Sequence, residues 1–178
     1  LILTKPLGPG IVLAGKRLKE LGDDEYQNAL NSMRHLNRNA CQVMQKFNVR
    51  AATDITGFGL LGHLLKMAKA SNIQIEVNSE QLPSLPGAYQ LLELGCIPGA
   101  AFRNLKFVEA DTIFDKSIDY NLKMLTVDAQ TSGGILMSVP NQLAERILIE
   151  LKAKGESTSR IIGRTLTKQD HAPWLKVI

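Results

Sequence analysis

The chain has 178 residues, of which 44% are hydrophobic and 21% charged, and its formal net charge at pH 7 is +4. This composition excludes an intrinsically disordered chain and is typical of one globular domain that is long enough to bury its own core. Basic residues alternate with acidic ones, as in GKRLKELGDDEY, so the positive charge predicts a mixed, solvated surface and no nucleic-acid-binding face.

Cysteine usage and hydropathy indicate a reducing, aqueous compartment. Cys41 and Cys96 lack the CxxC spacing of metal or redox sites, so we expect two free thiols. The sequence contains no stretch of 18 apolar residues and no signal peptide, so we expect no membrane contact and a cytoplasmic protein. Because it starts LILTKPLG, without methionine and within an apolar run, we expect it to be part of a longer polypeptide.

The first half of the chain predicts short strands between helices. Residues 1–4 and 11–13 are typical of strands on either side of a Pro-Gly loop. Asp23 and Asp24 favour the start of a long helix, because apolar residues recur every three or four positions from Tyr26 to Phe47. The other elements expected here are strands over 49–55 and 73–77 and helices over 60–70 and 86–94.

The second half predicts a Gly/Pro loop over 95–104, followed by a weak strand over 105–109 and a helix near 115–122. The remaining elements expected are a strand over 134–139, a helix over 142–154, a strand over 159–166 and an irregular tail. Strands and helices alternate without a regular βαβ rhythm, so we predict an α+β fold, with a mixed β-sheet and packed helices.

The stretch TDITGFGLLGHLL, which starts at Thr53, is the first candidate site. A strand that ends in TDIT brings Asp54 to the edge of a sheet, while Gly57 and Gly59 allow backbone amides to approach a ligand before a helix begins. An acidic side chain beside an anion-binding helix start would repel a phosphate there unless a cation such as Mg²⁺ bridges the carboxylate to the phosphate. The alternative is that Asp54 merely accepts hydrogen bonds from the turn amides and Thr56. His63 is interpreted as structural.

The second candidate is DAQTSGG, Asp128 to Gly134, whose hydroxyls and glycines are typical of an anion-binding backbone loop. It has no P-loop lysine, and it is also consistent with a simple turn into a buried strand. A third segment, Pro98 to Asn104, carries Arg103 and has the composition of a phosphate-binding loop, although a loop arginine usually remains solvated. No nucleophile with a neighbouring base is evident.

Three segments together resemble one family. LILTKPLGPGI, ATDITGFGLLGHLLKMA and DAQTSGGILMSVP are similar, in order, to the signature segments of selenophosphate synthetase (selenide, water dikinase), within the aminoimidazole ribonucleotide synthetase superfamily. The resemblance implies that residues 1–178 are the single, sandwich-like C-terminal domain of a longer enzyme. The family makes selenophosphate, AMP and phosphate from ATP, selenide and water with Mg²⁺, and its reactive Cys or selenocysteine and essential Lys lie in the N-terminal half.

The resemblance implies that Asp54 is the magnesium ligand and that the QTSGG loop lines the same cleft. The residues predicted to contact the nucleotide are Thr56, Gly57, Gly59, Gln130, Thr131, Ser132, Gly133 and Gly134. The family also implies contact with the N-terminal domain and a homodimer of the full-length protein. Because the nucleophile-bearing half is missing, the isolated chain is predicted to be inactive, with no catalytic residue of its own.

Besides a mild change at Ala129, where the family usually has DPQTSGG, the chain departs from the usual family pattern in two places. The family usually has PLGTG where this sequence has Pro9 between two glycines, and PGGT where it has Ala100 and Ala101. Each change removes a hydrogen-bond donor. Two alternatives therefore stay open: another enzyme of the superfamily, such as a thiamine-phosphate kinase, purine-pathway synthetase or hydrogenase-maturation relative, or a degenerate regulatory or assembly module.

Overall fold

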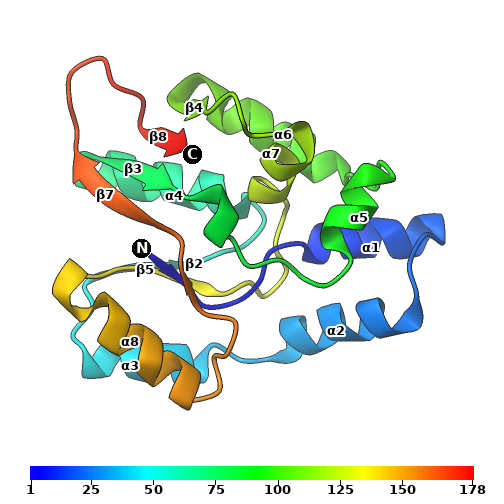
Figure 1. The fold of residues 1–178 in the computed structure, drawn as a ribbon, viewed down its shortest axis with the longest axis horizontal. Coiled ribbons are helices and arrows are strands. Elements are labelled where there is room, and N and C mark those ends of the chain that lie inside the picture. Colours follow the sequence, from blue (N-terminus) through cyan, green and yellow to red (C-terminus); the bar gives the residue numbers. More distant parts are fainter.

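Two four-stranded sheets organise the chain in the computed structural model, which describes all residues, 1–178 (Figure 1). The first sheet is antiparallel throughout and has the order β2 (Ala51–Asp54), β5 (Ile135–Ser138), β1 (Ile2–Leu3) and β6 (Arg160–Ile161). The second sheet is mixed and has the order β4 (Thr112–Phe114), β8 (Leu175–Val177), β3 (Ile73–Val77) and β7 (Gly163–Thr167).

Eight α-helices pack around these sheets. They are α1 (Pro9–Leu18), α2 (Asp23–Arg34), α3 (Arg38–Lys46), α4 (Gly59–Ser71), α5 (Ala88–Glu93), α6 (Gly99–Val108), α7 (Tyr120–Thr126) and α8 (Asn141–Ala153). Two short 3-10 turns, η1 (Ser79–Gln81) and η2 (Glu109–Asp111), complete the elements. The predicted α+β class is confirmed. None of the helices combines the length and apolarity that crossing a bilayer requires.

The first sheet is covered on both faces, which explains why β5 begins with three consecutive apolar residues, Ile135 to Met137. Ile2 and Met137 face α3 and α8, which lie side by side below the sheet in Figure 1 and close a small core. Leu3 and Leu136 point to the opposite face, into a larger core that includes α4 and the inner side of the second sheet. Because side chains alternate along a strand, two neighbouring residues serve two cores.

The predicted strand over 11–13 is wrong, because these residues lie within helix α1. Pro9 occupies the first turn of α1, where its fixed φ suits a helix start. The predicted long helix over the stripe from Tyr26 to Phe47 exists as two helices, α2 and α3, with a break between Arg34 and Arg38. Leu36 belongs to the apolar stripe but lies in this break, where it is 73% exposed.

The predicted loop over 95–104 and strand over 105–109 are also wrong, because helix α6 spans most of both segments. Its Ala101, Asn104 and Val108 form the buried face, which has helical and not alternating spacing. The tail contains β8, a central strand of the second sheet, and is therefore not irregular. The predictions of α4, β3, β5 and α8 are confirmed within a few residues. Both cysteines are free, as expected.

Candidate functional site

The two candidate motifs lie next to each other at one end of the first sheet. β2 and β5 pair antiparallel, so Asp54 at the end of β2 faces Ile135 at the start of β5, just after the QTSGG loop. Asp54 is exposed, and its carboxylate has no hydrogen bond or ion pair with any side chain or amide of the chain. A ligand can therefore reach this carboxylate directly.

His63 holds the turn that follows Asp54. The backbone N–H of Thr56 donates to His63 Nε2 at 3.1 Å, and the Thr56 hydroxyl lies 3.1 Å from the same nitrogen. Because an amide N–H can only donate, His63 Nε2 is unprotonated and the ring is neutral. Burial lowers the pKa of His63, against the raising effect of the Asp54 charge. The interpretation of His63 as structural is confirmed, and the Thr56 amide is not available to Asp54.

The QTSGG loop is locked to the same turn by backbone hydrogen bonds. The Gln130 N–H donates to the Thr56 carbonyl at 3.0 Å, and the Ile55 N–H donates to the Gly134 carbonyl at 2.9 Å. At Gly133 an added β-carbon would lie 2.3 Å from the Ile55 carbonyl oxygen, so only glycine fits this close approach. The two motifs therefore move as one unit.

The predicted nucleotide contacts differ in accessibility. Thr131 and Ser132 are exposed at the tip of the loop, whereas Gln130, Gly133 and Gly134 are buried. Gln130 donates through Nε2 to the carbonyl and the carboxylate of Asp128, so its amide serves the loop itself. Within this loop, the two hydroxyls are the groups that the structure leaves accessible to a ligand.

The glycines of the first motif have different environments. Gly57 is exposed, and an added β-carbon there would meet no atom within 4 Å, so its backbone is open to a ligand. Gly59 is buried with φ +69°, and an added β-carbon would lie 2.7 Å from the Val127 backbone. The missing side chain of Gly59 thus serves packing between the motifs, and a nucleotide contact from Gly59 stays a prediction.

Asn104 is an organising residue that the sequence reasoning missed. It is buried on α6, and its amide group donates to the Gly57 carbonyl at 2.9 Å and to the Val127 carbonyl at 3.0 Å. The loop interpretation of 98–104 concealed this role, because a helical α6 is what aims Asn104 inward. Arg103, the residue proposed there for phosphate, is exposed and forms no ion pair.

Asp128 connects the second motif to α1. Its carboxylate accepts a hydrogen bond from the Gly10 amide at 3.0 Å, in the first turn of α1, although the two residues are 118 positions apart. The side chain is fully buried, and burial raises the pKa of Asp128 to about 7, against the lowering effect of its hydrogen bonds. The residue supports the site from inside and does not face a ligand.

Beside this unit lies a pocket of about 760 Å³ between α1 and the start of α6. Its lining includes Thr131 and Ala129 from the second motif, Gly99 from α6, and the basic residues Lys16 and Arg17 from α1. Lys16 forms an ion pair with Asp23 at 2.7 Å, so Arg17 is the unpaired cation at this concave surface. Together with the helix start, it favours an anionic ligand.

The donor set at Asp54 fits a magnesium ion only in part. No group of three or more His, Cys, Asp and Glu side chains gathers anywhere in the chain. One exposed, unpaired carboxylate is nevertheless what a Mg²⁺ ion uses when substrate phosphates and water supply its other oxygens. The residues present therefore fit a shared site, in which this chain contributes a single ligand.

Comparison with known proteins relates the whole chain to one family. Residues 1–176 match the family described as "AIR synthase related protein, C-terminal domain". The chain is 46% identical over 173 residues to the selenide, water dikinase of Porphyromonas gingivalis (strain ATCC BAA-308 / W83), covering 97% of this chain and 49% of that protein. It is 38% identical over 170 residues to selenide, water dikinase 2 of Peptoclostridium acidaminophilum, with 96% and 49% covered. The chain thus spans about half the length of these relatives.

Solved structures share the fold at lower sequence identity. Escherichia coli HypE, described as a hydrogenase maturation protein, superimposes with a TM-score of 0.69 at 18% identity, over 99% of this chain and 44% of that one. Thiamine-monophosphate kinase from Stenotrophomonas maltophilia K279a superimposes with a TM-score of 0.63 at 14% identity, over 99% and 48%. These likenesses establish the fold alone.

Proposed function

Since this chain belongs to the AIR synthase related protein family, C-terminal domain, we propose that it forms the C-terminal half of a selenide, water dikinase. The observation that carries the proposal is the 46% identity to such an enzyme over 97% of the chain. The exposed, unpaired carboxylate of Asp54 beside the QTSGG loop is the structural feature that supports it. The whole enzyme would convert ATP, selenide and water into selenophosphate, AMP and phosphate in the cytoplasm.

In this proposal Asp54 contributes one oxygen ligand to Mg²⁺, and the ion supplies neutralisation of phosphate charge when bound. The chain's own residues position the nucleotide. His63 and Asn104 fix the turn at Thr56 and Gly57, so that the open backbone of Gly57 faces the ligand. The hydroxyls of Thr131 and Ser132 donate hydrogen bonds to phosphate oxygens, which costs little reorganisation because the loop is already fixed.

The chain supplies no nucleophile for the reaction. Cys96 is buried, and burial raises the pKa of its thiol, which disfavours the reactive thiolate. The proposal therefore assigns the reacting groups to an N-terminal half, to which this domain docks within a homodimer. The isolated chain binds part of the substrate and does not turn over ATP.

A second candidate is another ATP-using enzyme of the same fold, such as a thiamine-monophosphate kinase or a HypE-like hydrogenase-maturation protein. The fold supports it, since these proteins superimpose on the chain over 99% of its length. Their identities of 18% and 14% are far below the 46% to the dikinase, so substrate assignment follows the dikinase.

A chimaera tests the proposal. This chain replaces the matching C-terminal half of the Porphyromonas gingivalis enzyme, and AMP release from ATP is measured with and without selenide. We expect selenide-dependent AMP formation by the chimaera and none by the isolated chain. Asp54→Asn should lower the rate at least about 100-fold, as loss of a metal ligand does, while the exposed, unpaired Asp170→Asn serves as a control that retains activity. An Asp54→Asn chimaera as active as the control would refute the assignment, and ATP use that depends on thiamine monophosphate would favour the second candidate.

A further inference from the structure

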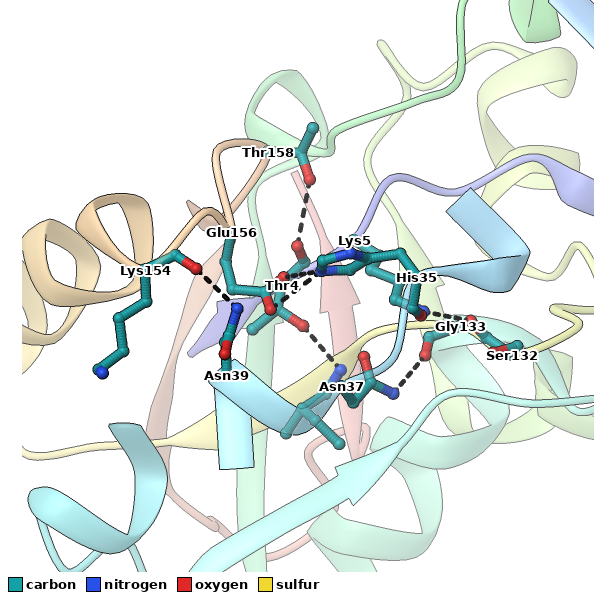
Figure 2. A network of polar contacts seen from close by, with 11 residues as sticks. Thr4, Lys5, His35, Asn37, Asn39, Ser132, Gly133, Lys154, Glu156 and Thr158 are labelled. Carbon is teal, nitrogen blue, oxygen red and sulfur yellow. Dashed lines mark hydrogen bonds and ion pairs between the residues drawn. The ribbon is translucent and has the colours of Figure 1, made fainter. Parts of the chain in front are cut away.

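A buried lysine lies directly behind the QTSGG loop (Figure 2). Lys5 follows β1 and is only 3% exposed. Its ammonium donates to the Ser132 carbonyl at 2.8 Å and to the His35 carbonyl at 2.6 Å. The lysine thus joins the exposed tip of the loop to the break between α2 and α3.

Keeping the ammonium of Lys5 charged in a buried position is energetically unfavourable. Burial lowers the pKa of Lys5, and the nearby carboxylate of Glu156 opposes this effect. Glu156 is itself 2% exposed, and both of its oxygens lie 3.1 Å from His35 Nε2. Replacing buried charged groups together with their partners by apolar residues of similar size is often neutral or stabilising, whereas removing one partner alone is destabilising. Stability alone therefore does not require a set of buried charges at this position.

The surrounding contacts show what the ammonium holds. The Asn37 side-chain amide donates to the Gly133 carbonyl at 2.9 Å, and the Ile135 N–H donates to the Thr4 hydroxyl at 2.8 Å (Figure 2). The backbone of the loop is thereby fixed from behind at Gly133 and Ile135. Lys5 extends this row of contacts to Ser132, which is the exposed residue of the three.

Ser132 needs such a contact because its backbone is strained. Its φ of +52° lies in the left-handed region, which costs a residue with a side chain about 1 to 2 kcal/mol. A charge-assisted hydrogen bond from an ammonium to a carbonyl contributes energy of the same order. The orientation of the Thr131 and Ser132 hydroxyls therefore depends on Lys5.

We propose that Lys5 is a positioning residue of the nucleotide site: its ammonium fixes the Ser132 carbonyl and so directs the Thr131 and Ser132 hydroxyls toward the phosphates. This inference rests on the proposed function for its ligand, but the tether itself is a property of the isolated chain. Glu156 and His35 act one step further away, by keeping the ammonium charged and in place.

The first test measures amide hydrogen exchange in the isolated chain at Gln130 and Ile135, the hydrogen-bonded amides on either side of the loop tip. Lys5→Met keeps the length of the side chain but removes its donors, and we expect exchange there to become about tenfold faster. Glu156→Gln, which keeps a partner for His35, should give an intermediate increase. Ile147→Val and Leu151→Ala lie in the small core under the sheet and serve as controls for general loss of stability, in which exchange at Gln130 and Ile135 should rise no more than elsewhere in the domain.

The second test measures the KM for ATP in the chimaera. We expect Lys5→Met to raise this KM about tenfold, while the two core variants leave it within about twofold. Unchanged exchange at Gln130 and Ile135 in Lys5→Met would overturn the inference, and so would faster exchange with an unchanged KM for ATP. An inactive wild-type chimaera would refute the proposed function alone, since faster exchange in Lys5→Met would still support the tether.

Discussion

Replacing Asp128 by asparagine should change how the stability of the chain depends on pH. Asp128 is fully buried beneath the loop and accepts a hydrogen bond from the Gly10 amide at the start of α1. The helix start favours a negative charge, whereas burial disfavours it. Burial has the larger effect, because the pKa of Asp128 is raised from 3.8 to about 7.

The sign and size of the effect follow from proton linkage. Between pH 4 and 7 the folded chain keeps Asp128 protonated while the unfolded chain ionises it, so the folded state binds more protons. The free energy of unfolding therefore falls as pH rises through this window. With pKa values of 3.8 and about 7, the loss between pH 5 and pH 8 is about 2 to 3 kcal/mol. Asparagine cannot ionise and carries no such loss.

The measurement is urea unfolding of wild type and Asp128→Asn at several pH values from 5 to 8. The difference between the two proteins isolates Asp128, because all other titrating groups are shared. We expect the free energy of unfolding of the variant, relative to that of the wild type, to rise by about 2 to 3 kcal/mol between pH 5 and pH 8. Parallel curves would show that the buried carboxylate stays ionised and that the helix start outweighs burial, which would refute the reasoning.

Three further predictions concern packing and hydrogen bonding. Gly133→Ala should destabilise the chain by about 1 to 3 kcal/mol, because its β-carbon would lie 2.3 Å from the Ile55 carbonyl. In Gly57→Ala the β-carbon meets no atom, so the loss of stability should be well under half of that. Equal losses for the two variants in urea unfolding would contradict the geometry. His63→Leu leaves the Thr56 N–H without its acceptor and should cost about 1 to 3 kcal/mol. Because burial lowers the pKa of folded His63, wild type also loses stability as pH falls below about 6.5, and this loss should be absent from His63→Leu. Leu151→Ala should cost about 2 to 5 kcal/mol, whereas Ile149→Ala, 66% exposed on the same helix, should leave the melting temperature nearly unchanged.

Local pattern predicted those elements whose side chains meet a nearby core with regular spacing. The leucines of α4 and the alternation of β3 are examples, and both were placed within about one residue. The position of Asp54 at the end of a strand was likewise predictable, because β2 precedes a glycine turn. The adjacency of the TDIT and QTSGG motifs could be predicted only from their resemblance to a family, because the pairing of β2 with β5 produces no pattern within either segment.

Two of the errors have the same cause, which is that the deciding partner is distant in the sequence. The start of α1 is satisfied by Asp128, so the residues before it show no capping side chain. The break between α2 and α3 is fixed by two hydrogen bonds, from the Lys5 ammonium to the His35 carbonyl and from the Asn37 side-chain amide to the Gly133 carbonyl. Helix α6 is a different case, because it begins at Gly99 without a side-chain cap, and Gly95, Pro98 and Gly99 are typical of a loop.

The strand order of the first sheet has a consequence for how the chain acquires its structure. Ile2 pairs with both Met137 and Ile161, and Ala51 pairs with Ser138. Every ladder of this sheet therefore joins an early segment to a late one, and such high contact order makes folding slow. During synthesis, the segment bearing Asp54 leaves the ribosome long before its partner strand exists. The end of the sheet that carries Asp54 therefore cannot form before residues 135–138 have been synthesised.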